Sequence, residues 1–232
     1  MKGLFITFEG TEGSGKSTQI RLLADTLREL NRTVRVLREP GSTPIGEEIR
    51  HTLKHSQQNQ AMTPQAELLL MNAARAQLVR EIIRPALAAG QLVLCDRFFD
   101  STIAYQGFGR GLDRGAVEQL IDFAVGETRP DLTLLLAIPL AVSEARRSSR
   151  QVSLFKGLSE TAAGLPRLGF TEPLRDRMEE ADRGFFERVE RGYEAIAAAE
   201  PDRVRVIDAT QTVDAVQAAV WREVERLLAQ NR

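Results

Sequence analysis

The sequence of 232 residues predicts an α/β fold, in which a doubly wound parallel sheet of five strands is flanked by helices. Two observations carry this prediction. Short apolar runs alternate with longer segments whose apolar residues recur every three or four positions, and this alternation implies parallel strands joined by right-handed crossovers. In addition, the runs that begin at Leu92 and Leu132 are apolar on consecutive residues, as expected for strands that are covered on both faces.

The elements follow one another in a regular order. The predicted strands are residues 4–8, 33–37, 92–95, 132–138 and 204–207. Stripes of helical periodicity run over residues 20–30, 117–124, 174–196 and 213–227, and we interpret them as core faces. Segment 151–173 interrupts the pattern with three glycines and two prolines, which predicts a long loop that is either a mobile lid or partly disordered. The sequence therefore predicts a single domain over residues 1–232, with a lid or insertion at about 146–175.

Charge and composition exclude several classes of protein. Lysine plus arginine number 31 and aspartate plus glutamate 32, so the basic excess that is usual for nucleic-acid binding is absent. The most apolar stretch, residues 132–142, is about half as long as a membrane helix requires. The one cysteine, Cys95, excludes an intrachain disulfide and fits a reducing compartment. We expect a soluble, cytoplasmic protein without a nucleic-acid or membrane partner.

A phosphate-binding motif follows the first predicted strand. Residues 10–17 read GTEGSGKS and match the pattern G-x-x-x-x-G-K-[ST] at every fixed position. In such a P-loop, backbone N–H groups surround a phosphate, the lysine reaches the β- and γ-phosphates, and the serine hydroxyl can bind Mg²⁺. A chance glycine-rich turn is the alternative, but the strand before the motif and the helix after it favour a nucleoside triphosphate site. The predicted ATP-binding residues are Gly10, Thr11, Glu12, Gly13, Ser14, Gly15, Lys16, Ser17 and Thr18.

The rest of the chain discriminates among the classes that use this loop. A GTPase would carry an N-K-x-D guanine motif and a D-x-x-G switch, and the sequence contains neither. A motor ATPase usually has paired acids after a buried strand, whereas here Asp96 is followed by Arg97. Asp96 can still serve Mg²⁺, directly or through water, and we predict Ser17 and Asp96 as the metal site. Arg97 indicates a second anion.

Further arginines point to a phosphorylated acceptor. Arg38 and Arg97 each follow a predicted strand, and ligands of doubly wound sheets gather beyond the carboxyl ends of strands. Two guanidinium groups there suit a phosphate other than those of the triphosphate, although each alone could be a surface salt bridge. Arg146, Arg147 and Arg150 introduce the predicted lid and could act as arginine fingers, or they could belong to a solvated basic helix face. Together these features indicate a nucleoside monophosphate kinase.

The chain resembles the thymidylate kinase family over nearly its whole length. The shared motifs are FEGTEGSGKST at 8–18, REPGST at 38–43, AAR at 73–75, DRF at 96–98, STIAYQG at 101–107 and DRME at 176–179. The resemblance implies Mg²⁺-dependent transfer of the γ-phosphoryl group of ATP to dTMP, giving dTDP, and a homodimer packed through helices. Because the phosphate loop lacks arginine while Arg146 and Arg150 stand in the lid region, the chain resembles the bacterial-type form of the family.

The resemblance also implies roles for individual residues. The catalytic residues would be Lys16, Arg97, Arg146, Arg150 and Glu39, with Glu39 helping to order Mg²⁺ and water. Arg38 and Arg97 would hold the acceptor phosphate, and Glu12 would lie at the acceptor sugar. The base pocket would comprise Arg50, Met71, Arg75, Thr102, Tyr105 and Gln106, with Arg75 bonded to the thymine edge.

Four departures from the family pattern leave alternatives open. Met71 stands where the family usually has a phenylalanine that stacks on thymine, so a related deoxynucleotide kinase with relaxed base choice is one alternative. Ser42 replaces a usual glycine, which restricts that turn. Segment 151–173 is longer than the usual lid by roughly 20 residues, and an insertion of this kind can retune closure. This long lid, with Ala137 in place of a frequent aspartate, motivates the other alternative, a nucleotide-binding regulatory protein that has lost catalysis.

Overall fold

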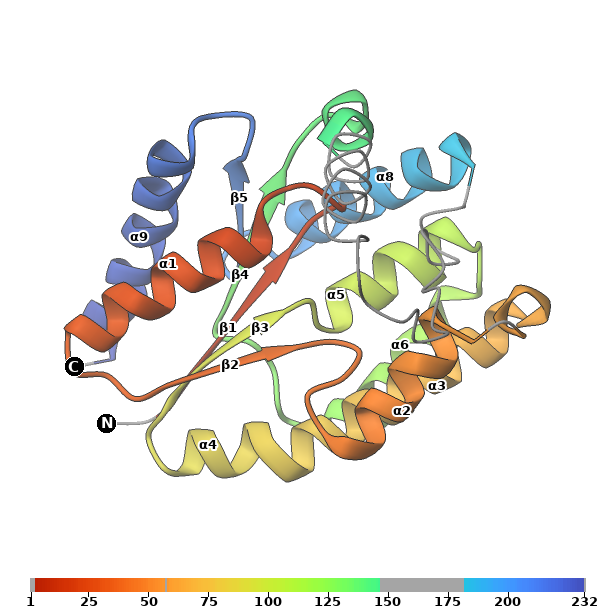
Figure 1. The fold of residues 1–232 in the computed structure, drawn as a ribbon, viewed down its shortest axis with the longest axis horizontal. Coiled ribbons are helices and arrows are strands. Elements are labelled where there is room, and N and C mark those ends of the chain that lie inside the picture. The colour runs from red at the N-terminus through yellow and green to blue at the C-terminus, as the bar shows by residue number, and fades with distance from the viewer. Residues whose placement is uncertain (1–2, 57, 147–181, 232) are drawn as a thin grey trace, which may run out of the picture.

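The computed structural model describes residues 3–56, 58–146 and 182–231 (Figure 1). The sheet consists of β1 (Leu4–Glu9), β2 (Val34–Arg38), β3 (Leu92–Asp96), β4 (Leu132–Ala137) and β5 (Val204–Asp208). All of its neighbouring strands are parallel, in the order β2-β3-β1-β4-β5. This arrangement confirms the predicted fold class, and each strand begins and ends within one residue of its predicted bounds.

Helices connect the strands. They are α1 (Lys16–Glu29), α2 (Pro44–Lys54), α3 (Pro64–Leu78), α4 (Arg84–Ala88), α5 (Phe99–Thr102), α6 (Arg114–Val125), α8 (Arg183–Ala199) and α9 (Val213–Gln230). Residues 140–146 are also helical. A short 3₁₀ turn, η1 (Asn59–Ala61), and two π-helical segments, η2 (Val79–Ile83) and η3 (Ile103–Gly109), complete the described elements. The predicted lid after Arg146, including Arg150, and the first part of the helix expected over 174–196 lie outside the described residues.

Short polar side chains define where several helices begin. Thr43, Thr63 and Thr212 each accept a hydrogen bond from the backbone N–H three residues ahead, and Asp113 and Asp182 do the same. Proline follows at the first helical position of α2 and of α3. These residue types satisfy N–H groups that a helix start would otherwise leave without partners. The caps therefore fix the ends of α2, α3 and α8, which frame the site described below.

The two faces of the sheet are covered by different helices (Figure 1). Leu4, Ile6 and Phe8 of β1 pack with α1 and α9 on one face. Phe5 points to the opposite face, where α3, α4 and α6 supply the apolar partners, and α8 packs there against β4 and β5. Because side chains alternate along a strand, Thr7 and Glu9 also face this second side. The second face therefore carries buried polar groups at the carboxyl end of β1.

Close helix packing shapes the second face next to these polar groups. Helix α8 lies against η3, and a Cβ atom at Gly109 would come within 2.6 Å of the Phe185 ring. At Gly192, a Cβ atom would come within 3.0 Å of the Ala104 backbone. Glycine at both positions lets the two segments approach closely. Tyr105 of η3 and Tyr193 of α8 are thereby held edge to face, with ring centroids 6.3 Å apart.

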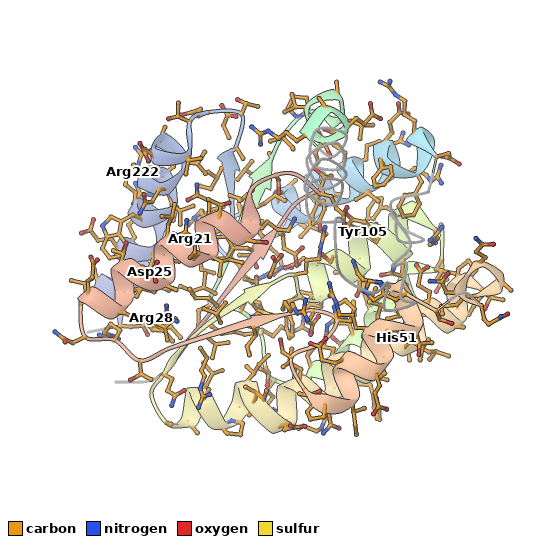
Figure 2. The ribbon with its side chains drawn as sticks, in the orientation of Figure 1. Arg21, Asp25, Arg28, His51, Tyr105 and Arg222 are labelled. Carbon is orange, nitrogen blue, oxygen red and sulfur yellow. The ribbon has the colours of Figure 1, made fainter. Side chains whose placement is uncertain are left out.

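The outer surface of α1 is charged. Asp25 is flanked by Arg21 and Arg28 on neighbouring turns (Figure 2), at 3.9 Å and 3.1 Å between the charged atoms. These side chains are more than half exposed, so the pairs contribute little to stability. Within the described parts of the chain, none of the helices combines the length and the apolar character that a bilayer crossing requires.

Candidate functional site

The phosphate loop connects β1 directly to α1. Gly10 and Gly15 have φ angles of 127° and 93°, in the region that residues with a Cβ atom rarely adopt, and a Cβ at Gly10 would lie 2.4 Å from the Leu136 carbonyl oxygen. The buried Lys16 side chain folds back over the loop. Its Nζ donates to the carbonyl oxygens of Gly10 and Thr11, at 3.0 Å in each case. The predicted loop residues therefore form a compact turn closed by the lysine.

A hydroxyl and a carboxylate meet beside this loop. Ser17 Oγ donates to Asp96 Oδ2 at 3.0 Å, which links the first turn of α1 to the end of β3. Oxygen donors of this type are those that Mg²⁺ prefers, and a hydroxyl with one carboxylate leaves room for waters and phosphate oxygens around the ion. The two predicted metal ligands thus lie together and fit Mg²⁺ chemically. The N-terminus of α1 adds the positive end of the helix dipole, which favours an anion at this position.

Strand register places two predicted arginines at neighbouring strand ends. Asp96 of β3 pairs with Phe8 of β1 on one side and with Arg38 of β2 on the other. Arg97 N then donates to Phe8 O at 2.9 Å and extends the ladder by one residue. The backbones of Arg38 and Arg97 therefore both reach the edge that carries the phosphate loop, as the sequence predicted.

The guanidinium groups of these arginines have different surroundings. Arg38 is half exposed and donates to Glu47 Oε2 at 2.9 Å. Arg97 points inward, where Nη1 contacts Ser101 Oγ at 3.0 Å and Tyr193 OH at 3.2 Å, and Nη2 contacts Tyr105 OH at 3.3 Å. Its guanidinium carbon also lies 5.0 Å from the centre of the Tyr105 ring. The two arginines share an edge of the sheet but are not bonded to a common group.

The charged groups near the phosphate loop shift the pKa values of Arg97 and Tyr105. Burial alone would lower the pKa of Arg97, but Tyr105, Tyr193, Glu12 and Glu9 together hold it well above its ordinary value. Burial raises the pKa of Tyr105, so this phenol stays protonated near neutral pH. Glu12 contributes to the pKa shifts of both groups, so its carboxylate lies within electrostatic reach of Arg97 and Tyr105.

Arg75 and Glu39 form a buried ion pair. Arg75 Nε donates to Glu39 Oε2 at 2.8 Å, Nη1 donates to Asn72 Oδ1 at 3.1 Å, and Nη2 donates to the Phe98 carbonyl at 3.1 Å. Burial raises the pKa of Glu39 to about 7, although Arg75 opposes this shift. Glu39 Oε1 is buried and has no hydrogen-bond partner in the described structure. Glu39 is therefore joined to Arg75, and the structure does not bring it into contact with Ser17 or Asp96.

The other predicted base-pocket residues lie on α2, α3, α5 and η3. Gln106 is buried and donates through Nε2 to Glu67 Oε1 at 2.8 Å, and Arg110 neutralises the same carboxylate at 3.0 Å. Thr102 is buried, and Met71 is partly exposed one helical turn before Arg75. Arg50 donates to the Pro40 carbonyl at 2.9 Å. This carbonyl precedes the turn that contains Ser42, whose φ of 67° a glycine would adopt more readily.

The helical segment 140–146 touches the phosphate loop from the other side. Arg146 Nη1 donates to the Gly13 carbonyl at 3.1 Å, and Ser143 Oγ donates to the Glu12 carbonyl at 2.7 Å. Arg146 Nη2 also bonds the Ala209 carbonyl at 3.2 Å, next to β5. The structure thus brings Arg146 into contact with the phosphate loop.

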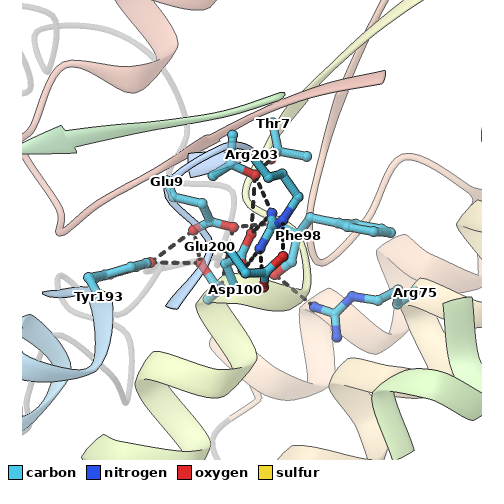
Figure 3. Close-up of polar contacts among 10 residues, drawn as sticks. Thr7, Glu9, Arg75, Phe98, Asp100, Tyr193, Glu200 and Arg203 are labelled. Carbon is cyan, nitrogen blue, oxygen red and sulfur yellow. Dashed lines mark hydrogen bonds and ion pairs between the residues drawn. The ribbon is translucent and has the colours of Figure 1, made fainter. Parts of the chain in front are cut away.

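Sequence reasoning missed a buried polar network beneath the site (Figure 3). Glu9 accepts hydrogen bonds from Ser101 and Tyr193, and Asp100 forms an ion pair with Arg203 at 2.7 Å. The only signal for Glu9 in the sequence is that it ends an apolar run. Tyr193 belongs to the apolar stripe of a helix, and its buried ring confirms the predicted core position, but the stripe does not predict the polar contacts of its hydroxyl.

The comparisons with known proteins agree with this geometry. A sequence model of the family described as Thymidylate kinase matches residues 8–159. The curated thymidylate kinase of Alcanivorax borkumensis is 45% identical over 229 residues, covering 99% of each chain, and that of Geobacter sulfurreducens is 48% identical over 218 residues, covering 94% of each. The crystal structure of thymidylate kinase from Ehrlichia chaffeensis matches with a TM-score of 0.71 at 31% identity, covering 97% of this chain and 99% of that one. The similarity extends over the sheet and all the segments that form the site.

Proposed function

Since this chain belongs to the thymidylate kinase family, we propose that its phosphate loop binds ATP and that the arginine and tyrosine side chains beside the loop bind dTMP. The family catalyses the ATP-dependent phosphorylation of dTMP to dTDP, and the chain is a phosphotransferase of this kind. The observation that carries the assignment of roles is the meeting of Lys16, Asp96 and Arg97 at the adjacent carboxyl ends of β1 and β3.

The donor half of the site comprises the loop residues Gly10 to Thr18. Lys16 would exchange its loop carbonyl partners for the β- and γ-phosphate oxygens, and the backbone N–H groups would bind the remaining oxygens. Ser17 and Asp96 would hold Mg²⁺, which when bound neutralises charge on the phosphates. Arg146 would add a guanidinium at the loop, and Arg150 is proposed for the same task on the sequence pattern alone.

The acceptor half would be built around Arg97. Its guanidinium, with that of Arg38, would bind the dTMP phosphate, and Glu12 would lie near the sugar. Binding of a phosphate by Arg38 requires that its ion pair with Glu47 opens. We assign the base to the pocket formed by Arg50, Met71, Arg75, Thr102, Tyr105 and Gln106. Glu39 would act there through Arg75, and its unpartnered Oε1 could order a water molecule.

In the proposed reaction, an oxygen of the dTMP phosphate attacks the γ-phosphorus of ATP. A new P–O bond forms, the bond between the γ-phosphorus and the β–γ bridging oxygen breaks, and ADP leaves with that electron pair. Most of the catalysis in such a transfer comes from positioning and charge neutralisation. Lys16, Arg97 and Arg146 supply positive charge around the transferred group, so no side chain needs to form a covalent bond with it.

Substrate selection provides the direct test of this function. ADP release in a coupled assay is expected with dTMP, and at much lower rates with dCMP and dGMP. Met71→Phe should tighten the binding of dTMP by about fivefold or more, because a stacked aromatic ring contributes about 1–3 kcal/mol per base. It should also sharpen the preference for dTMP, because the ring would pack on the thymine methyl group that dUMP lacks. Equal rates with all four nucleotides would contradict the base assignment, and ATP binding without turnover would support the non-catalytic alternative.

The titration of Lys16 predicts how ATP binding depends on pH. Burial, with a contribution from Arg97, lowers the pKa of this ammonium to about 8, while Asp96, Glu12 and Glu9 oppose the shift. At pH 8 and above the phosphates are fully ionised, because the second pKa of a phosphate is about 6. Bound ATP favours the protonated lysine, so ATP binding should take up a proton between pH 8 and 9, and the affinity should fall as the pH rises through this range.

Calorimetry in two buffers of different ionisation enthalpy measures this proton uptake. The variant Lys16→Met should take up no proton in the same pH window. Uptake that persists in this variant would assign the proton to another group. The effect of Lys16 on folding stability has the opposite pH dependence to its effect on ATP affinity. Because the native state binds fewer protons than the unfolded state between pH 8 and 10.5, Lys16 adds stability as the pH rises across that range.

We further propose that the protein is a cytoplasmic homodimer with one catalytic domain per chain. Helices α2, α3 and α6 pack side by side, and each exposes a large apolar side chain: Ile45, Leu69 and Phe123. Phe123 is 80% exposed, which supports burial against a second copy. Light scattering should give twice the mass of the chain for the wild type and a single chain mass for Phe123→Glu. A monomeric wild type would contradict this proposal.

A further inference from the structure

We propose that Glu9, acting through the hydroxyl groups of Ser101 and Tyr193, positions the guanidinium of Arg97 for the acceptor phosphate. The inference rests on the proposed function, because it presumes that Arg97 binds that phosphate. It adds a group that would not itself touch the substrate. Glu9, Ser101 and Tyr193 are therefore positioning residues, and each comes from a different element: β1, α5 and α8.

The carboxylate of Glu9 is fully buried and surrounded by donors (Figure 3). Oε1 accepts from the Phe98 N–H at 2.7 Å and from the Ser101 N–H at 3.3 Å. Oε2 accepts from Ser101 Oγ at 2.6 Å and from Tyr193 OH at 2.9 Å. Burial and Asp100 raise the pKa of Glu9, while Arg97, Ser101 and the Phe98 N–H oppose this shift. In its ionised form the carboxylate can only accept, and both hydroxyl groups then direct their protons toward it. Four donors offset much of the cost of burying this charge.

The direction of these protons determines whether the two hydroxyl oxygens present lone pairs to the Arg97 guanidinium. Each hydroxyl has one proton, and once that proton is given to Glu9 the oxygen presents lone pairs elsewhere. Arg97 Nη1 lies 3.0 Å from Ser101 Oγ and 3.2 Å from Tyr193 OH, where it can donate to both. Burial and the Glu9 carboxylate raise the pKa of Tyr193 well above its ordinary value, so the phenol keeps its proton. Glu9 therefore orients the guanidinium through two neutral oxygens.

A comparison with other arginines shows why this indirect arrangement matters. Arg75, Arg110 and Arg203 are each bonded directly to a buried carboxylate. Over the described ranges of the chain, Arg97 forms no direct ion pair, although it lies deeper in the fold than Arg38. A guanidinium that is held by neutral acceptors remains in place with its charge available for an anion. Direct pairing with Glu9 would oblige an incoming phosphate to displace a carboxylate.

The same carboxylate also fixes the backbone at Arg97. This residue has a φ of 70°, a conformation that costs a residue with a Cβ atom roughly 1–2 kcal/mol. The N–H of Arg97 donates to Phe8 O, and the next N–H, that of Phe98, donates to Glu9 Oε1. Both bonds tie the strained residue to the end of β1. Glu9 thus fixes the Arg97 guanidinium through the two hydroxyl groups, and it fixes the Arg97 backbone through the N–H of the next residue, Phe98.

The experiment compares a ligand that has the phosphate with one that lacks it. Dissociation constants of dTMP, thymidine and ATP are measured by calorimetry for the wild type, Tyr193→Phe, Ser101→Ala and Arg97→Ala. Tyr193→Phe keeps the packed ring and removes only the hydroxyl. We expect it to weaken dTMP about tenfold while thymidine and ATP bind as in the wild type. In the Arg97→Ala background, Tyr193→Phe should produce no further change.

A control variant removes a similar contact elsewhere. Thr128 is buried and accepts from Arg84 Nε at 2.8 Å before the start of β4, at the opposite edge of the sheet. Thr128→Val therefore deletes a hydroxyl–guanidinium contact outside the site and should leave all three constants unchanged. Should Tyr193→Phe not fold, Ser101→Ala tests the same relay from α5.

Each remaining outcome overturns a specific statement. If Arg97→Ala weakens dTMP relative to thymidine but Tyr193→Phe and Ser101→Ala do not, Glu9 does not position Arg97 and the proposed function stands. If the hydroxyl variants weaken thymidine and dTMP equally, their role is structural and the inference is wrong. If Arg97→Ala leaves dTMP binding unchanged, the assignment of Arg97 to the acceptor phosphate is itself wrong.

Discussion

Replacing Lys16 with alanine is expected to lower kcat for dTMP phosphorylation by about 10³-fold, the upper range for removing one preorganised group that stabilises charge in a transition state. The Lys16 ammonium is buried and held over the loop by the Gly10 and Thr11 carbonyl oxygens. It is therefore already in the loop when ATP arrives. Steady-state and single-turnover kinetics at saturating ATP and dTMP would measure the loss.

Two further variants sharpen this prediction. Lys54→Ala, on α2, removes another lysine and should retain near wild-type kcat. Lys16→Arg should recover little activity, because a planar guanidinium does not replace a compact ammonium in a tight loop. A Lys16→Ala enzyme with more than about a tenth of wild-type kcat would contradict the role of this lysine, since removing a catalytic charge costs at least 10²-fold.

Glu39→Ala is expected to lower the free energy of unfolding by about 3–5 kcal/mol, because it leaves Arg75 buried without its carboxylate. Both side chains are almost completely buried, with charged atoms 2.7 Å apart. Urea unfolding at pH 8, where Glu39 is ionised, would measure the loss. Asp25→Ala is the matched control. It removes the exposed carboxylate between Arg21 and Arg28 and should cost about 1 kcal/mol or less.

The pH dependence of this effect has a defined sign. Burial raises the pKa of Glu39 from its ordinary value of 4.5 to about 7. Between these two pH values, the native state therefore binds more protons than the unfolded state. Glu39 therefore adds stability below about pH 5, and this contribution is lost as the pH rises through 7. The difference between wild type and Glu39→Ala should widen as the pH falls from 8 to 5. A constant difference would contradict the raised pKa.

The fold could be predicted from the sequence because its three central strands, β1, β3 and β4, are buried on both faces. Runs such as 92–95 contain almost no polar residue, and the observed strands differ from the predicted ones by a single residue at their ends. The stripe that ends at Leu30 shows the limit of this reasoning. Helix α1 ends at Glu29, and Leu30 is 53% exposed. Periodicity continues across a helix end, because apolar spacing does not report where the backbone hydrogen bonds stop.

The donor half of the site was predicted more fully than the acceptor half. The phosphate loop is contiguous in sequence, so its residues are found together by spacing alone. The groups around Arg97 come from three elements, and only tertiary packing brings Ser101 and Tyr193 to one carboxylate. Tyr193 was interpreted as core because its ring obeys the helical stripe, whereas its hydroxyl is part of a polar network. The contact of Glu39 with Arg75 likewise depends on packing and not on spacing.

The π-helical segment η3 could not be predicted for a related reason. Its seven residues carry Tyr105 and Gln106, and they pack against α8 where Gly109 and Gly192 permit close approach. Widening of a helix by one residue per turn has no apolar signature of its own. It is stabilised here by contacts with a segment about 80 residues later in the chain, such as the bond from Arg188 Nε to the Gly109 carbonyl.

The left-handed backbone of Arg97 makes this position a point of local frustration. Glycine would relieve the conformational cost but would remove the guanidinium, so folding and phosphate binding favour different residues at one place. Selection for thermal stability alone should therefore accumulate glycine or asparagine at position 97 and lose turnover in the process. Laboratory evolution without a selection for activity would reveal this trade-off. Loss of Arg97 from such a population would show that activity is kept at this position at the expense of stability.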